Sequence, residues 1–170
     1  MKKLVFVLTT VVALAFSQTS KAQGTIVDAA VGNENFSTLV AALKAADLVG
    51  ALQGDGPFTV FAPTNDAFGK IDKETLGNLL KPENKETLTK ILTYHVVSGK
   101  LMAKDVVAAL KKGKGKVEVE TLAGQKLTVM QKGGKIWLKD QAGNYSEITA
   151  TDVAGSNGVI HVIDTVVMPK

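Results

Sequence analysis

The chain has 170 residues, 16 of them acidic and 20 basic, and it contains no cysteine. All the basic residues are lysines. The lack of cysteine excludes disulfides, a thiol nucleophile and cysteine metal ligands. The lack of arginine removes the side chain best suited to gripping phosphate and guanine, so we expect no nucleic-acid partner.

The N-terminus has the layout of a secretory signal peptide. Lys2 and Lys3 precede an apolar run over residues 4–16, and residues 20–22 form a small-residue cleavage site. The run is shorter than the ~20 residues that span a bilayer. We therefore expect cleavage after Ala22, no stable membrane insertion afterwards, and one exported domain over residues 23–170. With Lys2, Lys3 and Lys21 removed, this domain is almost neutral.

Apolar residues at three- and four-residue steps predict helices through the first half of the chain. Thr25 and Asp28 indicate a capping pair at the first helix start, and Pro82 suits a first helical turn. A β-branched and aromatic run predicts one strand at residues 58–62, and residues 94–97 run from a helix end into a strand. The other expected helices cover residues 36–43 with an extension to 48, 49–52, 73–80, 82–94 and 103–110.

The second half of the chain reads as β-structure. Short glycine-containing turns separate the apolar and alternating runs, as expected for a meander of strands. The expected strands cover residues 116–122, 126–131, 135–139, 147–153 and 159–168. A helical first half followed by a β second half predicts an α+β fold.

Three segments together resemble the fasciclin (FAS1) domain family. Residues 58–68 (FTVFAPTNDAF) resemble its first signature, residues 91–97 (ILTYHVV) its central tyrosine-histidine segment, and residues 157–169 (NGVIHVIDTVVMP) its closing signature. The resemblance implies a β-wedge of about seven strands packed with several α-helices. It also implies an extracellular or periplasmic protein of adhesion and matrix interaction, with no common catalytic site. The chain looks like a bacterial form with a single such domain.

Two of these segments hold candidate binding residues that also have a structural interpretation. Thr64, Asn65 and Asp66 suit a helix cap, and Asp66 could instead belong to an adhesive loop. The resemblance associates Tyr94 and His95 with receptor binding in some animal members. Their apolar neighbours favour a structural role, in which the polar atoms bind backbone groups in the core. Asn157, Gly158 and Asp164 belong to the closing signature as structural residues.

His161 lies in an alternating apolar run and is expected to be a buried structural histidine. Two histidines without cysteine, and without a nearby carboxylate cluster in sequence, predict no metal site and no cofactor. A serine hydrolase would need an oriented serine-histidine pair, and no Gly-x-Ser-x-Gly motif is present. The lysine-rich residues 111–116 read as a solvated, mobile connection. Lys111, Lys112 and Lys114 could alternatively bind an anionic polysaccharide or lipid headgroups.

Three functional hypotheses follow. The first is an exported, non-enzymatic binding or adhesion module for a cell-surface or matrix protein or polysaccharide. The second is a periplasmic binder of a small apolar or lipid-like molecule, which a sizeable apolar pocket would favour. The third is a hydrolase that uses His95 or His161 with a nearby serine or carboxylate.

Overall fold

A computed structural model describes residues 24–170, and the expected signal peptide lies outside them. The described residues form seven α-helices, two short 3-10 helices and one seven-stranded sheet, which confirms the α+β architecture. The α-helices are α1 Ile26–Val31, α2 Ser37–Ala45, α3 Val49–Leu52, α4 Asn65–Gly69, α5 Lys73–Leu79, α6 Lys85–Tyr94 and α7 Ala103–Lys112. The strands are β1 Phe58–Pro63, β2 Val96–Ser98, β3 Lys116–Glu120, β4 Lys126–Lys132, β5 Lys135–Lys139, β6 Tyr145–Gly155 and β7 Gly158–Ile163.

The sheet has the strand order β2-β1-β7-β6-β5-β4-β3 and closes on itself like a barrel. Only β1 and β7 pair in parallel; the other neighbours are antiparallel. A bridge between Val97 and Thr121, with a hydrogen bond from Leu122 N–H to Val96 O at 2.8 Å, joins the two edges. The long strand β6 pairs with β5 at its start and with β7 over the rest, and it carries two register shifts that let it bend between them.

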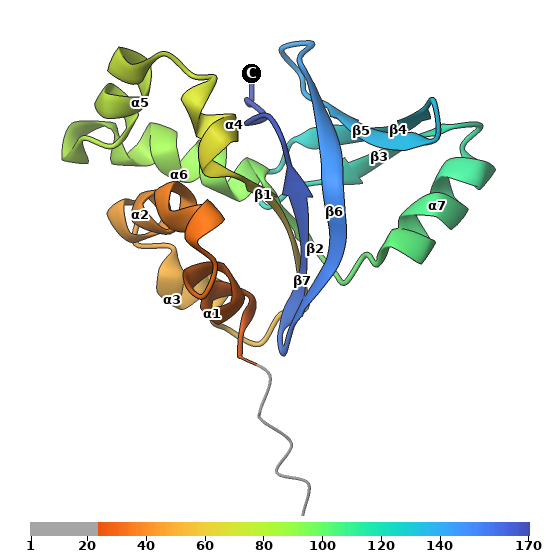
Figure 1. The fold of residues 1–170 in the computed structure, drawn as a ribbon, viewed down its shortest axis with the longest axis horizontal. Coiled ribbons are helices and arrows are strands. Elements are labelled where there is room, and N and C mark those ends of the chain that lie inside the picture. The colour runs from red at the N-terminus through yellow and green to blue at the C-terminus, as the bar shows by residue number, and fades with distance from the viewer. Residues whose placement is uncertain (1–23) are drawn as a thin grey trace, which may run out of the picture.

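The interior consists of two apolar clusters on opposite faces of β1 and β7. Helices α1 to α6 cover one face, and α7 lies on the other side beside β3 and β4 (Figure 1). Val60 and Ile160 belong to the first cluster, whereas Phe61 and Ile163 belong to the second. Because successive side chains of a strand point to opposite faces, both strands are buried on both faces, and Thr59 and His161 are their only polar side chains.

Some predicted boundaries were wrong for local reasons. Helix α2 does not extend to residue 48, because Asp47 adopts a left-handed conformation (φ 54°) that ends the helix. The last strand ends at Ile163 and not at residue 168, since the chain bends at Asp164 to bind β6. Lys111 and Lys112 are not in a mobile connection; they form the last turn of α7, where positive charge suits the helix dipole.

Candidate functional site

Asn157 connects three segments that lie far apart in sequence. Its Oδ1 accepts a hydrogen bond from Ile26 N–H at 3.0 Å, at the start of α1. Its Nδ2 donates to the carbonyl oxygens of Leu52 and Gly54, both at 2.8 Å, just where α3 ends. The next residue, Gly158, lies so close to β1 that a Cβ there would be 2.2 Å from the carbonyl oxygen of Phe58. This end of the closing signature therefore holds the helical layer onto the sheet.

Asn65, at the start of α4, also hydrogen-bonds to a segment that is distant in sequence, the start of α2. Its Oδ1 accepts from Thr38 N–H at 3.0 Å and from Ser37 Oγ at 3.2 Å, which caps the start of α2 from outside. Thr64 caps α4 itself, since its Oγ1 accepts from Ala67 N–H at 3.3 Å. Asp66 is exposed in the first turn of α4, and its predicted binding role stays a prediction.

His95 is buried and uses both ring nitrogens on backbone groups. Nδ1 lies 2.8 Å from the carbonyl oxygen of Ile91 and must donate to it, whereas Nε2 accepts from Val167 N–H at 3.2 Å. This pair of contacts fixes the neutral ring with its proton on Nδ1. Burial lowers the pKa of His95 from its usual 6.5 to about 4, although the Ile91 carbonyl and the Asp140 carboxylate act in the opposite direction.

Tyr94 is also fully buried, and its hydroxyl donates to the carbonyl oxygen of Lys126 at 3.1 Å. Burial raises the pKa of this phenol. The tyrosine thereby ties the end of α6 to the start of β4. Binding of a receptor by Tyr94 or His95 stays a prediction, and it would require these interior side chains to become exposed.

His161 is 1% exposed, in agreement with its expected burial, and it has the opposite tautomer. Nε2 donates to the carbonyl oxygen of Leu101 at 2.7 Å, and Nδ1 accepts from Asp152 N–H at 3.4 Å. The carboxylate of Asp152 accepts from Ala103 N–H at 2.8 Å, at the start of α7. His161 therefore positions the loop that leads into α7. Neither histidine has a serine or carboxylate hydrogen-bond partner within residues 24–170.

Asp164 attaches the C-terminal segment of the chain to β6. Its Oδ1 accepts from Glu147 N–H at 2.8 Å and from Thr165 Oγ1 at 3.0 Å, and Lys70 Nζ lies 3.2 Å from Oδ2. Burial alone would raise the pKa of Asp164, but these hydrogen bonds outweigh it, and the pKa lies below its usual value. In the described part of the chain, no three histidine or acidic side chains gather as metal ligands would.

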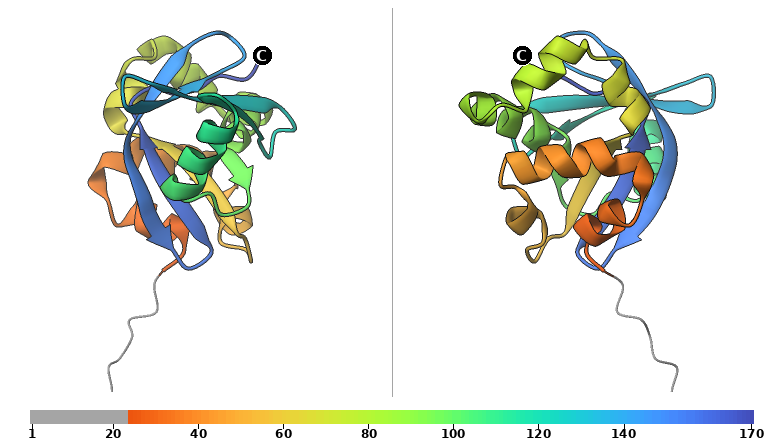
Figure 2. Two further views of the ribbon diagram at one scale, coloured as in Figure 1. Left: turned by 90° about the vertical axis from the view of Figure 1, so that its right-hand side faces the viewer. Right: turned by 60° about the vertical axis from the view of Figure 1, so that its left-hand side comes forward.

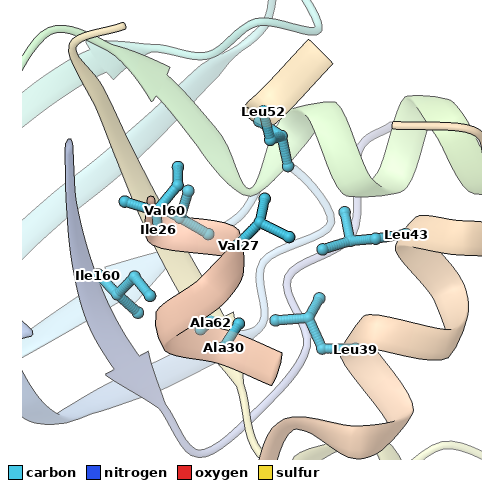
Figure 3. Close-up of a pocket in the computed structure, with 9 residues that line it drawn as sticks. All are labelled: Ile26, Val27, Ala30, Leu39, Leu43, Leu52, Val60, Ala62 and Ile160. Atoms are coloured by element: carbon cyan, nitrogen blue, oxygen red, sulfur yellow. The ribbon is translucent and has the colours of Figure 1, made fainter. Parts of the chain in front are cut away.

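The wedge between the helices and the sheet is closely filled. Apolar side chains from three helices and two strands converge on one small cavity (Figure 3), lined by Ile26, Val27, Ala30, Leu39, Leu43, Leu52, Val60, Ala62 and Ile160. The cavity measures about 10 Å³, which is room for about one water molecule. A lipid-like ligand does not fit this cavity as it stands.

Comparison with known proteins identifies the family. The sequence model of the Fasciclin domain matches residues 34–169, which is most of the chain.

The chain belongs to the fasciclin family.

Two relatives and one solved structure illustrate this. Protein sll1483 of Synechocystis is 54% identical over 145 residues, which cover 85% of this chain and 73% of that protein. Cell surface glycolipoprotein MPB83 of Mycobacterium bovis is 34% identical over 153 residues, 87% of this chain and 62% of that protein. A FAS1 domain pair from the insect cell adhesion molecule Fasciclin I has the same fold, with a TM-score of 0.73 at 20% identity, over 84% of this chain and 50% of that one. No helix of this fasciclin domain, as far as the structure describes it, could cross a membrane.

The fasciclin domain also has a surface that was not predicted from the sequence. Met130, Trp137 and Tyr145 lie on adjacent strands β4, β5 and β6 and border a hollow of about 530 Å³. We call this surface the outer face; it also carries Lys116, Lys132, Lys135 and Lys139. The signal was present in the alternation of Lys135, Trp137 and Lys139, which places all three side chains on one side of a strand. Lys114 lies near this face, because the carbonyl of the next residue, Gly115, accepts a hydrogen bond from Gln131 N–H at 3.0 Å.

Proposed function

We propose that this chain is an exported, non-enzymatic binding module that mediates adhesion at a cell surface or in an extracellular matrix. Family membership over residues 34–169 is the observation that carries the proposal. The chain's similarity to a cell surface glycolipoprotein and to a cell adhesion molecule supports the location and the role. The signal-like residues 1–22 support export.

The state of the two histidines supports a binding role over hydrolysis. A general base needs a free nitrogen lone pair within hydrogen-bond reach of its substrate. In His95 and in His161 that lone pair already accepts a backbone N–H, and the other nitrogen donates to a carbonyl. Both rings are also buried, so a substrate has no direct access to them. The small cavity of the wedge gives no support to the lipid-binding hypothesis.

Two measurements test the proposal. The intact mass of the exported protein should correspond to a chain that begins at Gln23; a product that retains residues 4–16 would make it membrane-anchored.

Beads coated with the exported protein should then retain cells or matrix of the source organism, whereas beads coated with the heat-unfolded protein should not. Equal retention by both preparations, or turnover of an ester substrate that His161→Asn abolishes without unfolding the protein, would contradict the proposal.

A further inference from the structure

We propose that the outer face of strands β3 to β6 binds a linear acidic polysaccharide that carries carboxylates, a polyuronate. This inference rests on the proposed binding function and assigns it a surface and a ligand chemistry. The sugar rings would lie against Trp137 and Tyr145, and the carboxylates would pair with the lysines around them.

The register of the sheet brings the relevant side chains together on one face. Met130 pairs with Trp137 across β4 and β5, and Lys139 pairs with Tyr145 across β5 and β6. Directly paired residues of antiparallel strands share a face, and their side chains are neighbours. The opposite face of the same strands is the buried one, where Val129 and Leu138 pack in the cluster that includes α7. The β4–β5 hairpin projects from the body of the molecule (Figure 2), so its outer face is open to solvent.

Part of each aromatic side chain on this face is exposed to solvent. Tyr145 is 50% exposed, and Trp137 is only partly buried beside it. Trp and Tyr supply rigid contact surface at low entropic cost. One face of a pyranose ring is made of C–H groups that can lie on an aromatic ring, while its hydroxyl groups stay in water. Trp137 and Tyr145 thus provide the platform that a sugar ring needs.

Lysines outnumber acidic residues on the outer face, which carries Lys116, Lys126, Lys132, Lys135 and Lys139 against Glu118, Glu120 and Glu147. Lys116, Lys132 and Lys139 form no ion pair with an acidic group within residues 24–170, and Lys139 Nζ lies 5.5 Å from the centre of the Tyr145 ring. Lys135 pairs with Glu147 at 2.7 Å, and that glutamate is the acidic neighbour of Trp137 across the strands. Lys135 and Lys139 stand four residues apart on β5, about 13 Å, with Trp137 between them. Cations at intervals along a strand complement a chain that carries a charge on each sugar.

A second hollow extends the outer face along the strands. It measures about 440 Å³ and is bordered by Lys116, Lys126 and Lys139 and by two acidic residues, Glu118 and Asp140. Glu118 is paired with Lys126 at 3.2 Å, and the Asp140 carboxylate accepts backbone N–H groups of Asn144 and Met168, so Lys116 and Lys139 are the cations left for a ligand. Lys139 borders this hollow while its ammonium lies over Tyr145, which borders the first. The two hollows together suit an extended polymer better than a compact molecule.

Other occupants fit these features less well. Lysine is depleted in the cores of protein–protein interfaces, whereas here lysines flank each aromatic ring. A second copy of the chain in a two-fold dimer would bring this same lysine-rich surface against itself. A linear polyanion avoids both difficulties, because it neutralises the lysines and keeps its hydroxyl groups hydrated.

Fluorescence provides a direct test, because Trp137 is the chain's single tryptophan. We expect polygalacturonate to change the emission of the exported protein in a saturable way and to bind more weakly as the salt concentration rises. Neutral dextran should give no change. No response to polygalacturonate, or equal or tighter binding to polyglutamate or to phosphatidylglycerol vesicles, would overturn the inference.

Two double variants separate this face from charge in general. Lys132→Gln with Lys139→Gln should weaken polygalacturonate binding about tenfold. Lys44→Gln with Lys73→Gln removes the same charge from exposed positions on α2 and α5 and should leave the affinity unchanged. Trp137→Phe, with circular dichroism to confirm folding, should reduce retardation in a gel that contains polygalacturonate. Equal losses in both double variants would contradict the assigned face.

The cell-retention assay distinguishes this inference from the proposed function. If the wild-type protein retains cells but binds no polyuronate, the ligand assignment fails and the adhesion function stands. If retention is observed and Lys132→Gln with Lys139→Gln abolishes it together with polygalacturonate binding, both statements are supported.

Discussion

The backbone N–H of Val167 donates a hydrogen bond to Nε2 of His95 at 3.2 Å and so fixes the last segment of the chain to the end of α6. This acceptor exists only while the imidazole is neutral, because a protonated ring carries an N–H on both nitrogens. Protonation would replace the hydrogen bond with two opposed donors in the core.

Mildly acidic conditions should therefore lower the free energy of unfolding of the protein. The pKa of His95 is about 4 in the folded protein and 6.5 in the unfolded chain, so the unfolded chain binds the proton first as the pH falls. The stabilisation is fully present above pH 6.5 and is lost progressively as the pH falls from 6.5 to about 4. The whole loss amounts to about 3 kcal/mol. Urea unfolding at pH 7.5, 6, 5 and 4.5 would measure this loss.

His95→Gln is the control for that measurement. It cannot titrate, so its stability should depend less on pH between 7 and 5, even if it is lower at every pH. A parallel pH dependence in the wild type and the variant would assign the acid sensitivity to other groups.

Tyr94 offers a test of the structural role of the tyrosine-histidine segment. Tyr94→Ala leaves a large cavity in the second cluster and should lower the free energy of unfolding by roughly 3–5 kcal/mol. Tyr94→Phe keeps the ring, loses only the hydrogen bond to Lys126 O, and should cost about 1 kcal/mol. Thermal melts would measure both. An unchanged melting temperature for Tyr94→Ala together with lost cell retention would instead make this residue a recognition site.

The local features of the fold could be predicted from the sequence because they depend on neighbours along the chain. The Thr25–Asp28 capping pair and the cap at Thr64 are both present. The early end of the last strand could not be predicted in the same way. It depends on the contact of Asp164 with Glu147, whereas the apolar run over Val166 and Val167 continues the strand pattern while the chain bends.

The candidate site depended even more on distant contacts. Asn157 and Ile26 are 131 residues apart in sequence, so nothing local indicated that this asparagine joins α1 to α3. The outer face had a local signal in Lys135, Trp137 and Lys139. That signal did not show whether this side of the strand is exposed, because alternation alone does not say which side is covered. The register of the sheet was needed to place Tyr145 and Met130 beside these residues.

Asn157→Ala should destabilise the contact between the helical layer and the sheet. It removes three hydrogen bonds to backbone groups at the ends of α1 and α3, for which we expect a loss of about 2–4 kcal/mol. Asn35→Ala is the control, since Asn35 is exposed and its side chain has no such role; its stability should stay within about 0.5 kcal/mol of the wild type. Chemical unfolding of both variants measures the difference, and equal effects would refute the connecting role of Asn157.

Two glycine-to-alanine changes should move stability in opposite directions. At Gly158 a new Cβ would meet the carbonyl oxygen of Phe58 at 2.2 Å, and that oxygen belongs to the parallel partner strand. Since β1 and β7 must separate to admit the methyl group, Gly158→Ala should cost about 3 kcal/mol or more.

Gly77 is exposed within α5, and a Cβ there meets nothing within 4 Å. Gly77→Ala should therefore stabilise the protein by about 0.5–1 kcal/mol, because alanine is the better helix former. Thermal unfolding of both variants would measure the signs, and a Gly158→Ala protein as stable as the wild type would show that the two strands are less closely packed than the structure indicates.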